Sequence, residues 1–243
     1  MMPRSLTIAV FLSALMALSG CQVARIKSAS GKVSQHQVPF ERNNPEASLK
    51  ILILGDSTGV GTGASSNTES VAGWFGQDFP TAHIRNISVN GEKISGLLEN
   101  FPDERSHYDL VILQIGANDI VHFTKFNNIE KEISTAIDRA KRIGDHVVIM
   151  HSGDVGLAPI FSWPLNHLYT SRTRVVRSIY MKMAQEKGVM YVDLFRKRQD
   201  ELFLKDIDKY YAADHFHPSG QGYRYWYDEI RKTLKNNGVE LKG

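Results

Sequence analysis

Residues Ile51–Ser57 read Ile-Leu-Ile-Leu-Gly-Asp-Ser, a run that is typical of one strand of a parallel sheet followed by a turn. Four apolar residues without polar alternation fit a strand whose two faces are both covered. Gly55 ends the run. Because ligands of open α/β sheets bind beyond the carboxyl ends of the strands, this strand is expected to deliver the Ser57 hydroxyl to a ligand site.

Strand-like and helix-like segments alternate along most of the chain after this run. Further strands are predicted at His83–Val89, Tyr108–Ile115, His146–Met150 and Val189–Val192. Helices are predicted at Val71–Phe79, at Ile94–Asn100, around the apolar residues from Ile129 to Ala140 and from Val175 to Met183, and from Ser219 to about Lys235. This alternation predicts an α/β fold, a three-layer α/β/α sandwich around a five-stranded parallel sheet.

The ends of three helices are also predicted. Asn127 or Asn128 can cap the helix that contains Ile129, and Gly144 can end it. Gly188 is expected to stop the next helix, and Ser219 to cap the last one.

The N-terminal part of the chain has a different character. Residues 1–20 contain Arg4 and an apolar stretch too short to span a membrane comfortably, which is typical of a signal peptide. Cys21, the single cysteine of the chain, ends the run Leu-Ser-Gly-Cys, which resembles the lipobox of bacterial lipoproteins. The alternative is an ordinary secretion signal with an incidental cysteine.

The lipobox resemblance implies a membrane anchor in the bacterial cell envelope, with Cys21 lipidated. Gln22 after it favours the outer membrane, facing the periplasm. Residues 21–48 are polar and lack periodicity, so we expect a flexible tether before a domain at 49–243. The net charge is only +3 and the basic residues are scattered, which argues against a nucleic-acid partner.

The run Asp214-His215-Phe216-His217-Pro218 places a carboxylate three residues before an imidazole. A serine hydroxyl is a poor nucleophile unless an adjacent base takes its proton, and a histidine base needs a partner that fixes its tautomer. His217 can be this base and Asp214 its partner, although His215 lies beside them. Pro218 favours an extended backbone at His217, which helps to present the ring.

Acyl transfer also needs hydrogen-bond donors for the developing oxyanion, and three candidates follow predicted strands. Ser57 can donate its own N–H, and Gly91, after the second strand, can donate another. Asn118, after the third strand, can donate from its side-chain amide. Asp56 and Asp119 are expected to hold these loops through hydrogen bonds to backbone N–H groups.

Four sequence blocks resemble those of the SGNH (GDSL) hydrolases: Gly55-Asp56-Ser57, Gly91, Gly116-Ala117-Asn118-Asp119 and Asp214-His215-Phe216-His217. Thr58 stands where the name GDSL has leucine. The resemblance implies a flavodoxin-like fold with strand order 2-1-3-4-5. It also implies that Ser57 is the nucleophile, His217 the base and Asp214 its orienting acid, and that Ser57, Gly91 and Asn118 form the oxyanion hole.

Two other motifs overlap the loop after the first strand. Residues Gly55–Gly59 match the G-x-S-x-G elbow of α/β-hydrolases, but that elbow usually follows several strands. Residues Gly59–Ala64 match a loose dinucleotide fingerprint, but no acidic residue ends the second strand. Taken singly, Ser57, Gly91 and Asn118 are ordinary turn residues, and only their combination at strand ends favours chemistry.

The sequence therefore predicts a serine esterase or acyl hydrolase that acts through an acyl-enzyme on Ser57, with an envelope carbohydrate or lipid ester as substrate. No cofactor is expected, and no metal, because His151 and Asp154 lack the spacing of metal ligands. The alternative is a non-catalytic lipoprotein that binds envelope glycans or lipids in the same cleft. The apolar segment Val155–Leu168 can wall a pocket or simply pack in the core.

Overall fold

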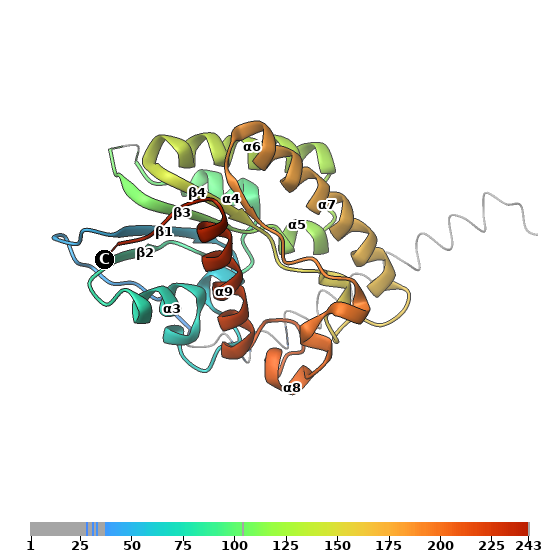
Figure 1. Ribbon diagram of the computed structural model, residues 1–243. Helices are drawn as coiled ribbons and strands as arrows, with labels where there is room; N and C mark the ends of the chain where they lie inside the picture. The colour runs from blue at the N-terminus through green and yellow to red at the C-terminus, as the bar shows by residue number, and fades with distance from the viewer. Residues whose placement is uncertain (1–27, 29–30, 32, 34–36, 104, 243) are drawn as a thin grey trace, which may run out of the picture.

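The computed structural model describes residues 28, 31, 33, 37–103 and 105–242 of the chain. Within this part, five parallel strands form one sheet in the order β2-β1-β3-β4-β5 (Figure 1). The strands are β1 (Lys50–Gly55), β2 (His83–Asn86), β3 (Tyr108–Gln114), β4 (Gly144–Met150) and β5 (Met190–Val192). The predicted α/β class and strand order 2-1-3-4-5 are confirmed.

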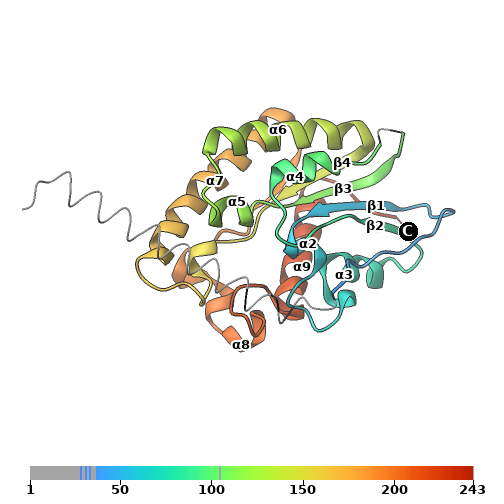
Figure 2. The same ribbon diagram turned by 180° about the vertical axis from the view of Figure 1, so that it is seen from behind.

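Helices cover both faces of the sheet, and together they complete the three layers (Figures 1 and 2). One face carries α3 (Val71–Asp78) and α9 (Gly220–Asn236), and the other carries α4 (Ile94–Glu99), α6 (Phe126–Ile143) and α7 (Leu165–Lys187). The loops contain the short helices α2 (Ser57–Val60), α5 (Ala117–Val121) and α8 (Ile207–Tyr210). They also contain the 3₁₀ helices η1 (Asn67–Glu69), η2 (Val155–Leu157), η3 (Arg198–Asp200) and η4 (Leu202–Leu204).

Two hydrophobic cores explain why the first strand is a continuous apolar run. Leu52 and Leu54 pack in the core beneath α4, α6 and α7, whereas Ile51 and Ile53 pack in the core beneath α3 and α9. Successive side chains of a strand point to opposite faces, so a strand that is covered on both sides needs an apolar residue at each position. β1 lies between β2 and β3, so the loops that follow these three strands emerge side by side at one edge of the sheet.

The helix ends agree with the predicted caps in part. The Ser219 hydroxyl accepts a hydrogen bond from the first turn of α9 and begins that helix, as predicted. The prediction for α6 was wrong, because the helical hydrogen bonds already begin at the Lys125 carbonyl, which accepts from the N–H groups of Asn128 and Ile129. Asn127 and Asn128 therefore lie inside the first turn, and neither is the cap.

The segment just before β1 is part of the folded domain. Arg42 exchanges two backbone hydrogen bonds with Ile84 of β2, at 2.8 and 2.9 Å, in an antiparallel bridge. Its guanidinium also donates to the carbonyl groups of Gly76 and Phe79, at 2.9 Å each. Glu41 and Arg42, which lie in the segment predicted as a tether, are therefore hydrogen-bonded to the edge of the sheet. The predicted signal peptide and Cys21 lie outside the described residues.

Candidate active site

Ser57 begins α2 directly after β1, and Asp56 fixes the turn between the two elements. Asp56 Oδ1 accepts hydrogen bonds from the backbone N–H of Thr58 at 2.9 Å and from its hydroxyl at 2.7 Å. This is the N-cap arrangement that satisfies an otherwise unpaired donor at a helix start. Asp56 is fully buried, and burial raises the pKa of its carboxyl. The carboxyl of Asp56 thus holds the backbone on which the Ser57 hydroxyl is presented.

Ser57, His217 and Asp214 form a continuous hydrogen-bonded series. His217 Nε2 lies 2.8 Å from Ser57 Oγ, and His217 Nδ1 lies 2.6 Å from Asp214 Oδ2. The second oxygen of Asp214 accepts from the N–H groups of Phe216 and His217, at 3.0 Å each. An ionised carboxylate can only accept, so in a neutral ring Nδ1 carries the proton and Nε2 accepts from the serine hydroxyl.

The environment of Asp214 keeps this carboxyl ionised. Asp214 is 4% exposed and His217 is 3% exposed. Burial by itself would raise the pKa of Asp214, but the hydrogen bonds and charge of His217 and the Phe216 N–H outweigh it and lower the pKa below its ordinary value. His215, the competing histidine, is exposed and has φ of 55°, a conformation that lets the turn bring Asp214 and His217 together.

The three predicted oxyanion donors come from the loops after three adjacent strands. Ser57 follows β1, Gly91 follows β2 and Asn118 lies in α5, directly after β3. Gly91 has φ of 79°, and a Cβ placed there meets nothing within 4 Å, so its backbone faces open space. Asn118 Nδ2 donates to the Glu92 carbonyl at 3.0 Å, which joins α5 to the loop that contains Gly91. The structure therefore brings these candidate donors to the same edge as Ser57.

Two further residues hold α5 in place. Asp119 Oδ2 accepts from the Ile94 N–H at 3.1 Å, which ties α5 to the start of α4. Arg172 of α7 donates to the carbonyl groups of Ile120 at 3.1 Å and Thr124 at 2.8 Å, at the end of α5. The Asp119 contact is the structural one predicted for this residue, whereas sequence reasoning missed Arg172, because nothing near it in the chain marks it.

The apolar segment Val155–Leu168 contributes an aromatic wall beside the histidine. Phe161 packs edge-on against Phe216, with ring centroids 5.8 Å apart, and also contacts Tyr169, at 4.6 Å. Phe216 in turn packs against the His217 ring, at 4.9 Å. Both interpretations of this segment hold, because Phe161 packs in the core while Val155 and Ala158 line a pocket next to His217.

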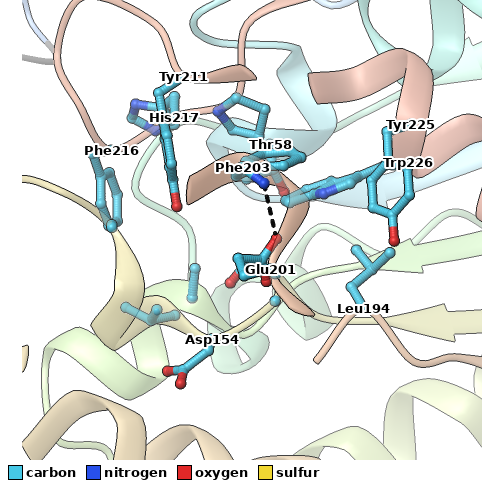
Figure 3. Close-up of a pocket in the computed structure, with 16 residues that line it drawn as sticks. Thr58, Asp154, Leu194, Glu201, Phe203, Tyr211, Phe216, His217, Tyr225 and Trp226 are labelled. Carbon is cyan, nitrogen blue, oxygen red and sulfur yellow. Dashed lines mark hydrogen bonds between the residues drawn. The ribbon is translucent and has the colours of Figure 1, made fainter. Parts of the chain in front are cut away.

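A pocket that sequence reasoning did not find lies beside His217 (Figure 3). It is lined by segments that follow β4 and β5, by the loop around His217, by α9, and by Thr58 of α2 and Ala117 of α5. Glu201, Phe203, Tyr211 and Trp226 are among its lining residues. No periodicity or motif in residues 198–211 marks Glu201, Phe203 and Tyr211, because the three-dimensional fold alone brings them to His217.

His151 is a buried residue of the core. Its Nε2 lies 3.0 Å from the Tyr191 hydroxyl, and its ring packs edge-on against Tyr180. Burial lowers the pKa of His151 to about 4, so the ring is neutral at pH 7. Within the described residues there is no group of His, Cys, Asp and Glu side chains that could hold a metal ion, and no helix is long and apolar enough to cross a membrane.

A serine, a histidine and an aspartate in hydrogen-bonded series, at the carboxyl edge of a parallel sheet, are the arrangement of a serine hydrolase site. The chain belongs to the GDSL-like lipase/acylhydrolase family, whose model matches residues 53–225. The resemblance seen in the four sequence blocks is thereby confirmed.

Comparisons with individual proteins agree with this family. A GDSL-like esterase of Mycobacterium tuberculosis is 22% identical in an alignment of 219 positions, which covers 83% of this chain and 64% of that protein's length. A solved lipase/acylhydrolase from Enterococcus faecalis superposes with a TM-score of 0.60 at 17% identity, over 80% of this chain and 99% of its own. A catalytic mutant of an acetylxylan esterase from Geobacillus stearothermophilus superposes with a TM-score of 0.56 at 19% identity, over 83% of this chain and 100% of its own. At these identities the solved structures support the fold.

Proposed function

We propose that this protein is a serine esterase that hydrolyses carboxylic esters through an acyl-enzyme on Ser57. The observation that carries the proposal is the series Ser57–His217–Asp214, with contacts of 2.8 and 2.6 Å and with a carboxylate that its hydrogen bonds keep ionised. Family membership and the esterase and lipase names of the related proteins support it.

The first half of the reaction forms the acyl-enzyme. Ser57 Oγ bonds to the ester carbonyl carbon while its proton passes to His217 Nε2, and the carbonyl oxygen becomes an oxyanion. The N–H groups of Ser57 and Gly91 and the Asn118 amide are the donors for this oxyanion, each contributing about 3 kcal/mol in good geometry. The bond to the alcohol oxygen then breaks, and the alcohol leaves with the proton from His217. Asp214 stays ionised and stabilises the imidazolium.

The second half releases the acid and restores the site. A water molecule gives a proton to His217 Nε2 and bonds to the acyl carbon, and the same donors hold the new oxyanion. The bond to Ser57 Oγ then breaks, and the serine takes the proton back from His217. One ester and one water thus become one acid and one alcohol, and no further reactant is needed.

An active-site label and a nucleophile variant test this mechanism. A fluorophosphonate should label the protein in one position, Ser57, and Ser57→Ala should lose both labelling and hydrolysis of p-nitrophenyl acetate. Ser178→Ala removes an exposed hydroxyl on α7 and is the matched control, which should keep both. Full hydrolysis by Ser57→Ala, or absence of labelling in the native protein, would contradict the proposal.

The natural substrate that we propose is an ester of an envelope carbohydrate or lipid, a class suggested by the predicted anchor. A series of p-nitrophenyl esters from acetyl to palmitoyl separates the two cases. A steep optimum at acetyl favours a decorated carbohydrate, and an optimum at long chains favours a lipid.

The anchor itself is a further part of the proposal. The run that ends at Cys21 supports lipidation of this cysteine and attachment to the outer membrane, facing the periplasm. Lipid chains contribute roughly 0.8 kcal/mol per buried CH₂ group, so more than one chain is needed for stable attachment. Cells grown with an alkyne-tagged fatty acid should produce a tagged protein in the membrane fraction, and Cys21→Ala should abolish the tag. An untagged native protein would contradict this part.

A further inference from the structure

The position and the lining of the pocket beside His217 indicate which kind of substrate the site can bind. It lies at the carboxyl edge of the sheet, the edge to which β1 delivers Ser57. Its empty volume of about 580 Å³ includes the solvent at its mouth, and about 50 Å³ of it can hold the centre of a water-sized group. Figure 3 shows Glu201 below the rings of Phe203 and Trp226 and above Asp154 in the same pocket.

The charge of the pocket lining is negative. Among the described lining residues there are two carboxyl groups, Asp154 and Glu201, and neither a lysine nor an arginine. Glu201 is only 7% exposed, and its carboxyl caps the start of η4, where Oε1 accepts from the Phe203 N–H at 3.3 Å. Burial raises the pKa of Glu201, and the neighbouring Asp154 raises it further, so the opposing charge of Arg196 does not compensate it fully. Arg196 is itself engaged by Glu229, at 2.9 Å.

Aromatic rings surround this carboxyl group. The ring of Phe203 is at the centre, with Tyr211 packed edge-on at 5.2 Å, Tyr225 at 6.1 Å and Trp226 nearly parallel at 6.4 Å between centroids. The faces of aromatic rings attract cations through their quadrupole, and a buried carboxylate gains most from a ligand that brings the opposite charge. Both features of the lining therefore favour a cationic ligand group, and an anionic one would be repelled.

The position of the pocket indicates which part of the ester it would receive. His217 itself lines the pocket together with Phe216 and Pro218, whereas Ser57 and Asn118 only adjoin it through their neighbours Thr58 and Ala117. In the proposed reaction His217 protonates the departing alcohol oxygen, so the alcohol must lie against this ring. The pocket is consequently on the alcohol side of the scissile bond.

We infer that this pocket binds the alcohol part of the substrate and that this alcohol carries an ammonium group. The inference rests on the proposed esterase function, and it narrows the substrate to esters of amino alcohols. Glu201 supplies the counter-charge, and the rings of Phe203, Tyr211, Tyr225 and Trp226 enclose the cation.

Two acetate esters of the same shape test the inference. Acetylcholine and 3,3-dimethylbutyl acetate differ in one atom, a positively charged nitrogen in place of a carbon. The native protein should hydrolyse acetylcholine with a kcat/KM at least about tenfold higher, mainly through a lower KM. Choline should likewise inhibit hydrolysis of p-nitrophenyl acetate about tenfold more strongly than 3,3-dimethylbutanol.

A matched pair of variants assigns the effect to Glu201. Glu201→Gln keeps the shape and an acceptor oxygen for Phe203 but removes the charge, and it should lower the preference for acetylcholine over the neutral ester about tenfold. Glu130→Gln removes a carboxyl group on α6, far from the pocket lining, and should leave this preference unchanged. A folded Glu201→Gln protein with the full preference would overturn the role of Glu201. If Glu201→Gln does not fold, two measurements on the native protein still test the ammonium site. They are its preference for acetylcholine over the neutral ester and its stronger inhibition by choline than by 3,3-dimethylbutanol.

The outcomes also separate this inference from the esterase proposal. A native protein that reacts with a fluorophosphonate and hydrolyses p-nitrophenyl acetate, but hydrolyses the cationic and neutral esters equally, overturns the ammonium site and leaves the esterase standing. A native protein that neither reacts with the label nor hydrolyses any of these esters overturns both.

Discussion

Asp214 accepts hydrogen bonds through both of its carboxylate oxygens, and so it has two roles in the site. One oxygen takes the His217 Nδ1 proton, and the other takes two backbone N–H groups of its own turn. The carboxylate therefore fixes the position of the ring and also its tautomer. An amide at this position could donate to Nδ1 and so reverse the tautomer, leaving a proton on Nε2 where Ser57 needs an acceptor.

Asp214→Asn should for this reason lower kcat by roughly 10³–10⁴-fold with little change in fold. The measurement is hydrolysis of p-nitrophenyl acetate together with circular dichroism of both proteins. Asp208→Asn, at an exposed site in α8, is the control and should stay within a factor of about two of the native rate. A comparable loss in both variants would mean that the loss does not come from the tautomer of His217.

His151 predicts a specific dependence of stability on pH. Burial disfavours the charged ring and lowers the pKa of His151 from its ordinary value of 6.5, which applies to the unfolded chain, to about 4 in the folded protein. The unfolded chain therefore binds a proton first as the pH falls, and stability is lost from pH 6.5 downward until the folded protein also binds it near pH 4. A shift of this size corresponds to about 3 kcal/mol.

His151→Gln removes this titration. The difference in unfolding free energy between native and variant proteins should shift by about 3 kcal/mol in favour of the variant between pH 7 and pH 4. Urea unfolding across this range measures it, and the buried carboxyl groups cancel because both proteins contain them. A difference that is constant with pH would show that His151 does not titrate in this way.

At the scale of elements, α5 is a short helix that neighbouring elements hold in place. It has five residues, from Ala117 to Val121, and it carries Asn118, so its position depends on neighbouring elements. Arg172 reaches across from α7 to the carbonyl groups at its end, and the guanidinium also stacks over Phe123 at 4.8 Å and Phe126 at 4.6 Å. These contacts fix the end of α5 and hence the direction of the Asn118 amide.

Arg172→Met should therefore lower kcat by roughly 10–100-fold while KM changes less, because a donor that is displaced by about 1 Å no longer meets the oxyanion. Steady-state kinetics with p-nitrophenyl acetate show the split between the two constants. Lys182→Met on the same helix removes an exposed cation and serves as the control, with no expected change in kcat. If Arg172→Met raised KM and left kcat intact, the residue would act on substrate binding instead.

At the scale of the molecule, the sheet has an edge at β2 that the chain before β1 covers. Arg42 pairs with Ile84 through the backbone, and Glu41 accepts from the Asn86 N–H at 3.1 Å. An uncovered strand edge exposes unpaired backbone groups, so this segment also protects the domain from pairing with other chains.

A chain that starts at Leu49 should be less stable than one that starts at Gln37 by roughly 5 kcal/mol, at about 1 kcal/mol for each of the five hydrogen bonds that Glu41 and Arg42 make with the domain. Urea unfolding of the two shortened proteins measures the difference, and Arg42→Met in the longer one should account for part of it. Equal unfolding midpoints would show that the segment only rests on the domain.

Several features of the fold were predictable because they depend on local pattern. The buried strands were visible as apolar runs such as Tyr108–Ile115, and the start of α9 was visible in Ser219, since both signals act over a few residues. The start of α6 could not be predicted. Asn127 and Asn128 are good N-cap residues, but the chain already turns into the helix at Lys125, so both lie inside the first turn. The pairing of Arg42 with β2 was hidden for a similar reason, since a polar segment gives no signal until its partner strand is in place.

The candidate site also has a part that could be predicted from the sequence and a part that could not. Ser57, Asp214 and His217 could be singled out from the chain because their residue types and order are unusual together, and hydrogen bonds reach between them only because β1 and the last loop meet at one edge of the sheet. Glu201, Phe203 and Trp226 lie in parts of the chain without any such signal, and they become a pocket only when η4 and α9 pack beside His217. The catalytic residues could be predicted from the sequence because the chemistry needs a few residues of fixed type in a recognisable order. The shape and charge of the substrate pocket could not, because they arise from contacts between distant segments, and those contacts exist only in the folded molecule.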